Sequence, residues 1–218
     1  YRDILDASQL FNIKSLSMED ANRNEFYRND KKREDAISNF DNYNKYLESL
    51  EMTAEISQFS KNYLTRITQL TNKTNQFNLT TKRMSEQEIE SLLKHSSNIS
   101  LYARLNDKFG ENGLVSLIQG NIEGHRIIID LWVMSCRVFN RTLENTLLYE
   151  FLREAQSRNL KTVIGKYIPT QKNKIVSNLY EEMGFSMVDQ NNGASTFELN
   201  LEGYSIPNNP NISLNKKI

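Results

Sequence analysis

The stretch "RIIIDLWVMSCRVFNRTLENTLLYEFLREA", residues 126–155, changes its hydrophobic period near its middle. Residues 126–135 form an almost continuous apolar run, which predicts a buried strand. After Cys136 the apolar residues recur at helical spacing, and the predicted buried stripe consists of Leu143, Leu147, Leu148, Phe151, Leu152 and Ala155. A strand that passes directly into an amphipathic helix indicates a layered α/β domain.

The segments on either side extend this pattern. Ser85 followed by Glu88 is a helix-capping pair, and Gly110, Gly113 and Gly124 stand at the joints expected of antiparallel strands. We therefore expect strands at 52–57, 98–107, 112–122, 126–135, 161–168, 184–189 and 194–201, with helices at 61–73, 85–95, after residue 136 and at 172–183. Mixed strands and helices in this order predict one α/β domain with a mixed sheet flanked by helices on both faces.

The chain divides into three predicted parts. Residues 1–50 read as a helical connector or extension, residues 51–205 as the α/β domain and residues 206–218 as a flexible tail. Within the first part, the charged residues 29–35 suggest a solvated connector. The residues expected to form an apolar helical stripe beside it are Ile37, Phe40, Tyr43 and Leu47.

Composition excludes several classes of partner. The 218 residues contain 27 basic and 27 acidic side chains, so the zero net charge favours neither nucleic acid nor an anionic membrane surface. No apolar run approaches the roughly 18–20 residues of a membrane span. A single cysteine indicates a reducing, cytoplasmic setting, and no Cys or His cluster has metal-ligand spacing, so we expect no metal site.

The segment "NLYEEMGF", residues 178–185, follows Asn173 closely. Together with the element order it resembles the end of the GNAT acetyltransferase fold. That resemblance implies that Asn173 lies near a pantetheine arm and that Tyr180 protonates a departing thiolate. The alternative for Tyr180, equally open, is that it fills the core. For Gly184 and Phe185 we prefer a structural role, a helix cap and a core side chain.

The same resemblance implies a phosphate-binding turn in "RVFNRTLE", residues 137–144. Asn140, Thr142 and Glu144 stand where glycines or small residues are expected, and a carboxylate there repels a pyrophosphate. This departure weighs against free coenzyme A as the donor. It still allows Arg137 or Arg141 to hold a single phosphate on a pantetheine arm.

Four stretches that follow one another along the chain indicate a more specific family. The set consists of "RITQLTNKTNQFNLTTKR" (66–83), "DKFGENGLV" (107–115), "SCRV" (135–138) and "YIPTQKN" (167–173). The set resembles the C-terminal part of FkbH-like proteins, glyceryl-transferase/phosphatase enzymes of polyketide pathways. The resemblance implies an upstream phosphatase domain of the HAD superfamily, subfamily IIIC, whose D-x-D-x-T motif is absent here. It also implies a glyceryl unit that passes from 1,3-bisphosphoglycerate to an acyl carrier protein. Family members in surface-polysaccharide clusters make other acyl groups an alternative.

Amide side chains are concentrated in the first of these stretches. Asn72, Asn75, Gln76 and Asn78 each offer donors and an acceptor, which suits a hydroxylated acyl chain or a pantetheine amide. Lys73 among them can meet a phosphate or remain solvated. The alternative is that the amides cap a helix and satisfy a buried turn.

The only cysteine, Cys136, lies at a predicted strand end, before a helix N-terminus and near two arginines. These features favour the thiolate and predict a nucleophile, although lone cysteines are often small buried hydrophobes. His125 lies at the other end of the strand, about 35 Å away along straight backbone, and cannot act as its base. His95, after a helix end, is a weak candidate.

The sequence therefore favours an acyltransferase that loads a small acyl group, glyceryl on the FkbH-like resemblance, onto the phosphopantetheine thiol of an acyl carrier protein. Beyond that arm, or coenzyme A in its place, we expect no cofactor in this domain. One alternative is a non-catalytic module that docks the carrier protein for the phosphatase domain. Another is an N-acyltransferase that uses acyl-coenzyme A in polysaccharide or natural-product biosynthesis.

Overall fold

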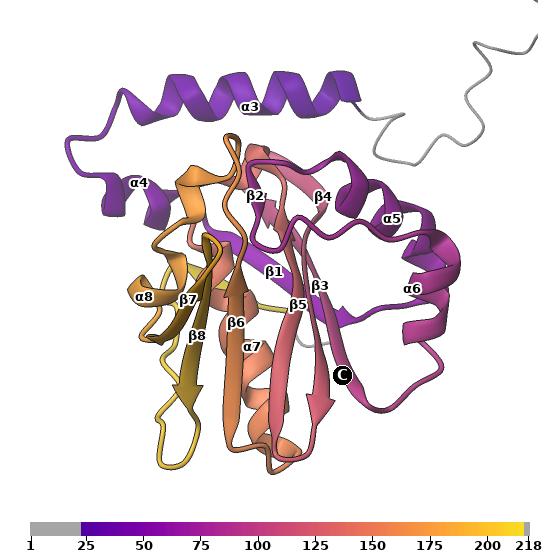
Figure 1. Ribbon diagram of the computed structural model, residues 1–218. Coiled ribbons are helices and arrows are strands. Elements are labelled where there is room, and N and C mark those ends of the chain that lie inside the picture. The colour runs from indigo at the N-terminus through magenta and orange to yellow at the C-terminus, as the bar shows by residue number, and fades with distance from the viewer. Residues whose placement is uncertain (1–22, 216–218) are drawn as a thin grey trace, which may run out of the picture.

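The computed structural model describes residues 23–215, and its core is one mixed sheet of nine strands between two helical layers (Figure 1). The strand order is β7-β8-β6-β5-β4-β3-β1-β9, and β2 pairs with β5 off this path. The strands are β1 (Met52–Gln58), β2 (Phe77–Asn78), β3 (Asn98–Asp107), β4 (Gly110–Glu123), β5 (Arg126–Met134), β6 (Thr162–Tyr167), β7 (Ser186–Asn191), β8 (Ala194–Asn200) and β9 (Ile212–Leu214).

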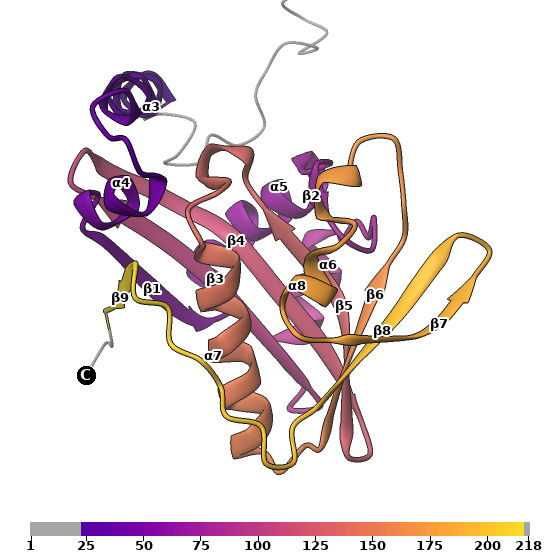
Figure 2. The ribbon, with the colours of Figure 1, turned by 90° about the vertical axis from the view of Figure 1, so that its left-hand side faces the viewer.

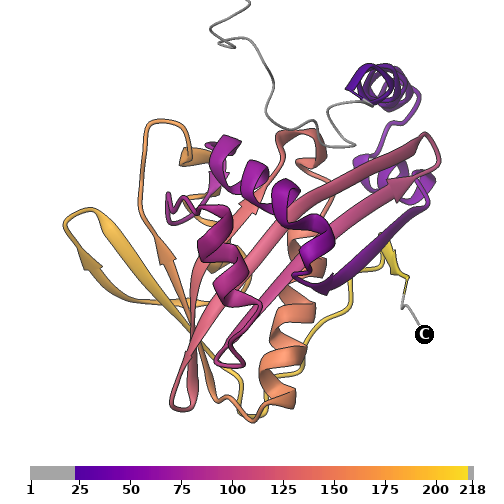
Figure 3. The same ribbon diagram turned by 90° about the vertical axis from the view of Figure 1, so that its right-hand side faces the viewer.

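Helices cover both faces of the sheet. Helix α7 packs on one face (Figure 2), and α5 and α6 lie on the other (Figure 3). The helices are α3 (Arg23–Ile37), α4 (Tyr43–Ser49), α5 (Leu64–Lys73), α6 (Glu86–Leu92), α7 (Leu143–Ser157) and α8 (Leu179–Glu182), with 3₁₀ turns η1 (Lys61–Tyr63), η2 (Cys136–Val138) and η3 (Lys174–Val176). In the described part of the chain, none of these helices has the length and apolarity needed to cross a membrane.

The stripe predicted for α7 forms the centre of the core. All six of its predicted side chains are fully buried, packed against strands β1, β3 and β4. A second core on the opposite face joins Ile67, Leu70 and Ile89 to Leu131 and Val133 of β5. The predicted capping box at Ser85 and Glu88 is also confirmed. These agreements establish the expected α/β fold with helices on both faces.

Strands β5 and β6 diverge, and this divergence positions the functional site. They pair in parallel only from Arg126–Thr162 to Ile128–Ile164. Further along β5, Phe77 and Asn78 of β2 pair with Met134 and Val133. The chain then continues through Leu79, which bonds to both sides: its N–H donates to the Trp132 carbonyl (3.3 Å), and its carbonyl accepts from the Ile168 N–H (2.8 Å). Residues 77–79 therefore fill the opening between the two strands.

The prediction for residues 29–35 was wrong. They lie inside α3 rather than in a solvated connector, and both Asn29 and Arg33 are buried. Arg33 is drawn inward because it pairs with Asp107 at the end of β3. The predicted stripe is also interrupted, since the helix breaks at residues 38–42 and leaves Ile37 and Tyr43 exposed. Residues 1–22 of the predicted connector lie outside the described part.

Two predictions near the C-terminus need correction. The described part of the expected flexible tail contains β9, which pairs in parallel with β1 and buries Ile212. The Asn215 N–H also bonds the Ala54 carbonyl at 2.8 Å. The helix expected at 172–183 is instead η3 followed by α8, because the backbone at Asn178 (φ −102°, ψ 3°) leaves helical geometry.

Candidate functional site

An open cavity of about 910 Å³ lies beside the carboxyl end of β5. Four segments line it: α3, α5 with the turn that follows it, the residues after β5, and the loop after β6. Ligand sites in α/β sheets commonly lie at strand carboxyl ends, where loops from several elements meet. The cavity is therefore the candidate site, and the predicted residues can be placed relative to it.

Cys136 lines this cavity and is exposed. The end of β5 holds it there, because the preceding Ser135 N–H donates to the Val115 carbonyl of β4 at 2.8 Å. The Cys136 carbonyl accepts from the Phe139 N–H at 3.3 Å and closes the turn η2. Cys136 is therefore not a buried hydrophobe, and its nucleophilic role remains a prediction that its placement permits.

The amide-rich stretch is split by the fold. Asn75 and Gln76, with Lys73, line the cavity, and the Asn75 Oδ1 accepts from Arg83 at 2.6 Å. Asn72 does not line it, because its Nδ2 donates to the Thr68 and Met84 carbonyls at 2.9 and 2.7 Å. These two bonds give Asn72 the structural role that the sequence had left as the alternative.

Asn78 and Asn173 are buried, and the Asn173 side chain bonds the backbone of Asn78. The Asn173 Nδ2 donates to the Asn78 carbonyl (2.8 Å) and to the Ile168 carbonyl (2.9 Å), while its Oδ1 accepts from the Thr170 N–H (2.7 Å). Asn173 is fully buried, and Asn78 is almost so. Neither lines the cavity, so the structure does not support the direct pantetheine contact expected of them. Instead they join the loop after β6 to β2.

Tyr180 lies in the core, away from the cavity. Its ring packs against Trp132 and Phe197, at centroid distances of 5.8 and 5.3 Å. A Cβ on Gly165 would lie 2.3 Å from the Tyr180 ring, so glycine there permits the close packing. Burial raises the pKa of Tyr180, although the Lys166 backbone opposes part of this rise. Within residues 23–215 no group meets hydrogen-bond geometry with its hydroxyl. This placement favours the core role over proton transfer.

Arg137 lines the cavity next to Cys136. Its Nη2 donates to the Asn112 carbonyl at 3.2 Å, and its guanidinium lies 4.4 Å from the centre of the Phe26 ring. A cation over an aromatic face is attracted by the ring quadrupole. Contacts with β4 and with α3 thus hold the guanidinium at the cavity.

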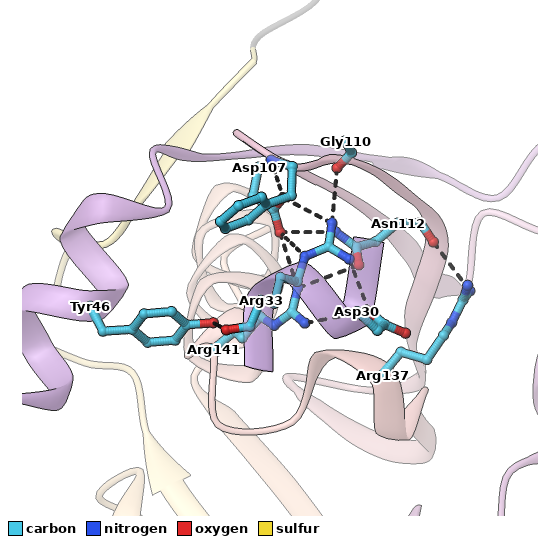
Figure 4. Close-up of polar contacts among 9 residues, drawn as sticks. Asp30, Arg33, Tyr46, Asp107, Gly110, Asn112, Arg137 and Arg141 are labelled. Carbon is cyan, nitrogen blue, oxygen red and sulfur yellow. Dashed lines mark hydrogen bonds and ion pairs between the residues drawn. The ribbon is translucent and has the colours of Figure 1, made fainter. Parts of the chain in front are cut away.

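Arg141, expected to meet a phosphate, lies instead in a buried ion-pair network (Figure 4). Its Nη1 is 3.1 Å from Asp107 Oδ2, and Asp107 also binds Arg33. Burial and the neighbouring Arg33 lower the pKa of Arg141. Arg141 does not line the cavity, because its guanidinium is bound to the fully buried carboxylate of Asp107.

Two carbonyls in the turn before α7 accept hydrogen bonds from distant parts of the chain. Asn140 and Thr142 both take left-handed dihedrals, with φ of 61° and 60°. The Asn140 carbonyl accepts from the Tyr43 hydroxyl at 2.9 Å, and the Thr142 carbonyl accepts from Asn209 Nδ2 at 2.8 Å. Neither residue lines the cavity. These bonds engage carbonyls, whereas a phosphate would bind N–H groups, so the phosphate-binding function expected of this turn remains a prediction.

Sequence reasoning missed the cavity residues from α3, and among those from α5 it named only Lys73 as a site residue. Phe26, Tyr27 and Asp30 come from a helix expected to be only a connector, and Arg66 and Gln69 from α5. Gln171 and Lys172 lie in a stretch that the sequence did single out, although neither was named. These residues converge only through folding, so no local pattern indicated them. Among residues 23–215 no group of three His, Cys, Asp or Glu side chains is placed to hold a metal ion.

No model of a protein family matches the chain, and a search of curated proteins finds no match. Its fold, however, is similar to that of solved acetyltransferases. A GNAT-family acetyltransferase from Streptococcus pneumoniae aligns with a TM-score of 0.55 at 16% identity, over 67% of this chain and 98% of that one. The ribosomal-protein-S18-alanine N-acetyltransferase from Escherichia coli gives 0.52 at 14%, over 68% and 94%.

A third structure, the spermidine N-acetyltransferase from Vibrio cholerae in complex with coenzyme A and spermine, gives a TM-score of 0.52 at 17% identity, over 70% of this chain and 96% of that one. At such low identities the likeness concerns the fold alone. The α/β domain described above therefore has the GNAT fold.

Proposed function

We propose that this domain transfers a small acyl group to the phosphopantetheine thiol of an acyl carrier protein, with Cys136 as a transient acyl carrier. The observation that carries the proposal is the position of Cys136: the chain's only thiol is exposed in a large cavity at the carboxyl end of β5. The GNAT fold supports acyl transfer as the class of reaction, because its similar solved structures are acetyltransferases.

The proposed reaction proceeds in two displacements. The Cys136 thiolate attacks the carbonyl carbon of an activated acyl group; a C–S bond forms and the bond to the leaving group breaks. With 1,3-bisphosphoglycerate as donor, the leaving group is inorganic phosphate. The carrier thiolate then attacks the Cys136 thioester, and the Cys136 thiolate leaves. The second step exchanges one thioester for another, so it is nearly balanced in free energy and can proceed in a well-oriented site.

The cavity residues have distinct roles in this proposal. The Arg137 guanidinium, next to Cys136 in the chain, can stabilise the negative charge that develops on the acyl oxygen. Asn75 and Gln76 offer amide donors and acceptors to a hydroxylated acyl group such as glyceryl. An upstream phosphatase domain, implied by the FkbH-like resemblance, would remove the remaining phosphate ester.

A second candidate is an N-acyltransferase that uses acyl-coenzyme A. It is favoured by similar structures that contain coenzyme A, the Vibrio cholerae enzyme and the PaiA N-acetyltransferase from Thermoplasma acidophilum. The residues Asn140, Thr142 and Glu144, which stand in the turn before α7 where glycines or small residues are expected, weigh against it. A non-catalytic docking module would use the same cavity without any covalent step on Cys136.

Intact mass spectrometry separates these three functions. The chain is incubated with 1,3-bisphosphoglycerate or with acetyl-coenzyme A, with and without a holo carrier protein. The proposal expects an acyl adduct on the chain that disappears when carrier is added and is absent from Cys136→Ala. Direct acylation of an amine by acetyl-coenzyme A without an adduct would support the N-acyltransferase. Carrier binding without any transfer would support the docking module.

A further inference from the structure

We propose that Lys73 and Lys172 form a phosphate-ester subsite at the cavity, and that Asn173 fixes the distance between them. This deepens the proposed function, because it names the residues that would receive the phosphate of a pantetheine arm. The subsite itself rests on charge and geometry and requires no acyl transfer.

The electrostatics of the cavity favour an anion between these lysines. Both side chains line the cavity and are exposed, and neither ammonium has a hydrogen bond or ion pair within residues 23–215. The single carboxylate among the described lining residues is Asp30. Its Oδ1 already accepts from Arg33 at 2.9 Å and lies 3.9 Å from Arg141. The two ammonium groups are therefore not neutralised by the cavity itself.

The two lysines come from separate segments that the fold joins together. Lys73 is the last residue of α5, and the chain runs from it through Asn75 into β2. Lys172 lies in the loop after β6, directly before Asn173. Asn173 is fully buried and bonds Asn78 of β2, and the Ile168 N–H bonds the Leu79 carbonyl at 2.8 Å. These bonds join the two walls that carry the lysines.

A phosphate ester is the anion that fits this pair. An ammonium is a compact point charge with three donors, and lysine commonly binds phosphate in this way. The exposed amides of Gln76 and Gln171 stand in the same two segments and line the same cavity, so they add neutral donors for the remaining phosphate oxygens. The presence of a lysine and at least one glutamine on each wall is the feature that assigns the subsite.

Asn173 acts here as a positioning residue, not as a ligand contact. Its Nδ2 faces the carbonyls of Asn78 and Ile168, so an aspartate in its place would turn an attraction on both sides into a repulsion. The two walls would then separate while both lysine charges remain. A loss of phosphate preference in Asn173→Asp would combine the changed spacing with the negative charge that the aspartate adds beside Lys172, so the lysine variants are the decisive test.

Calorimetry with 4′-phosphopantetheine and with pantetheine tests the subsite on the whole chain. We expect the phosphorylated compound to bind about tenfold more tightly, a preference that falls as salt is raised. Lys73→Ala and Lys172→Ala should each reduce it about threefold, and the double variant should remove it. Lys174→Ala is the matched control, because Lys174 is exposed two residues away and does not line the cavity.

Alkylation of Cys136 gives a second readout that needs no ligand. The chain has one cysteine, so modification by anionic iodoacetate and by neutral iodoacetamide reports the potential at a single thiol. The double lysine variant should lower the rate with iodoacetate about threefold and leave the rate with iodoacetamide unchanged. Equal changes with both reagents would mean altered access and would overturn the assignment.

Two further results would overturn the proposal. One is equal affinity of the wild-type chain for pantetheine and its phosphate; the other is a loss in Lys174→Ala as large as in Lys73→Ala. Should Asn173→Asp fail to fold, the lysine variants still decide. Coenzyme A in a parallel titration identifies the source, since tighter binding than phosphopantetheine would indicate the free coenzyme and equal binding a carrier arm. The titrations measure non-covalent binding, which requires no acyl transfer. The subsite can therefore be confirmed even if Cys136 carries no acyl group.

Discussion

Arg33 of α3 binds Asp107 at the end of β3 through two parallel hydrogen bonds. Its Nε lies 2.7 Å from Oδ2 and its Nη2 lies 2.8 Å from Oδ1. The Arg33 side chain is 2% exposed and that of Asp107 is 0% exposed. This bidentate pair attaches α3 to the sheet (Figure 4), and the same helix supplies Phe26 and Asp30 to the cavity.

Replacing Asp107 with Asn should destabilise the fold strongly. The carboxylate binds Arg33 and Arg141, so its loss leaves two buried guanidinium groups with Asp30 as their one remaining counter-charge among residues 23–215. Breaking a buried pair in this way costs about 3–5 kcal/mol. Urea unfolding measures the change, and Glu111→Gln is the control, because its pair with Arg104 is largely exposed. A loss below about 1 kcal/mol would contradict the structural role of the network.

Replacing Cys136 with Ala should abolish the acyl adduct and the loading of a carrier protein. The side chain is exposed, so the melting temperature should stay within a few degrees of the wild type. Intact mass spectrometry and a carrier-loading assay give the two readouts. Normal carrier loading by the alanine variant would show that transfer is direct and that Cys136 is no nucleophile.

Replacing Tyr180 with Phe should leave both transfer and folding essentially unchanged. The resemblance to the GNAT fold implied slower transfer, with a core role as the equally open alternative, but the hydroxyl is buried in an aromatic cluster and does not reach the cavity. Removal of a buried hydroxyl that has no hydrogen-bond partner among residues 23–215 costs little and can be stabilising. Steady-state rates and urea unfolding are compared with the wild type. A rate reduced tenfold or more at unchanged stability would restore Tyr180 as a proton donor.

Replacing Glu144 with Gln should stabilise the fold at neutral pH and flatten its pH dependence. Burial raises the pKa of Glu144, so the folded state binds its proton more tightly than the unfolded state does. Its contribution to the free energy of unfolding is therefore most favourable at low pH and is lost as pH rises through the raised folded pKa. Urea unfolding at pH 5 and pH 8 should show a smaller difference in the variant. Glu181→Gln, at an exposed position of α8, is the control, and identical pH dependence in Glu144→Gln and wild type would contradict the effect.

Replacing Gly165 with Ala should destabilise the sheet at β6. A Cβ there would lie 2.3–2.7 Å from three carbon atoms of the Tyr180 ring, which the surrounding core holds in place. Overpacking of this kind costs about 1–3 kcal/mol. Urea unfolding of the variant measures it, and an unchanged midpoint would show that the ring can move aside.

Local sequence patterns correctly predicted the elements whose buried faces follow a regular hydrophobic period. The α7 stripe from Leu143 to Ala155 is buried as predicted, and β3 spans the predicted residues 98–107. The two-residue strand β2 was missed, because its pairing with β5 has no periodic signal in so short a segment. The interpretation of residues 1–50 as the connector after a phosphatase domain remains a prediction.

The sequence by itself determined that Cys136 follows a strand and precedes a helix, because hydrophobic period and chain order are local properties. Only the tertiary structure decided which of the two neighbouring arginines lines the cavity together with that cysteine. Arg137 lies at the cavity, whereas Arg141, four positions further on, is turned away by Asp107, which lies 34 residues earlier in the chain. Arg33 meets the same carboxylate across 74 residues. An ion pair depends on which side chains folding brings together, and a local sequence pattern does not show which distant residues those are.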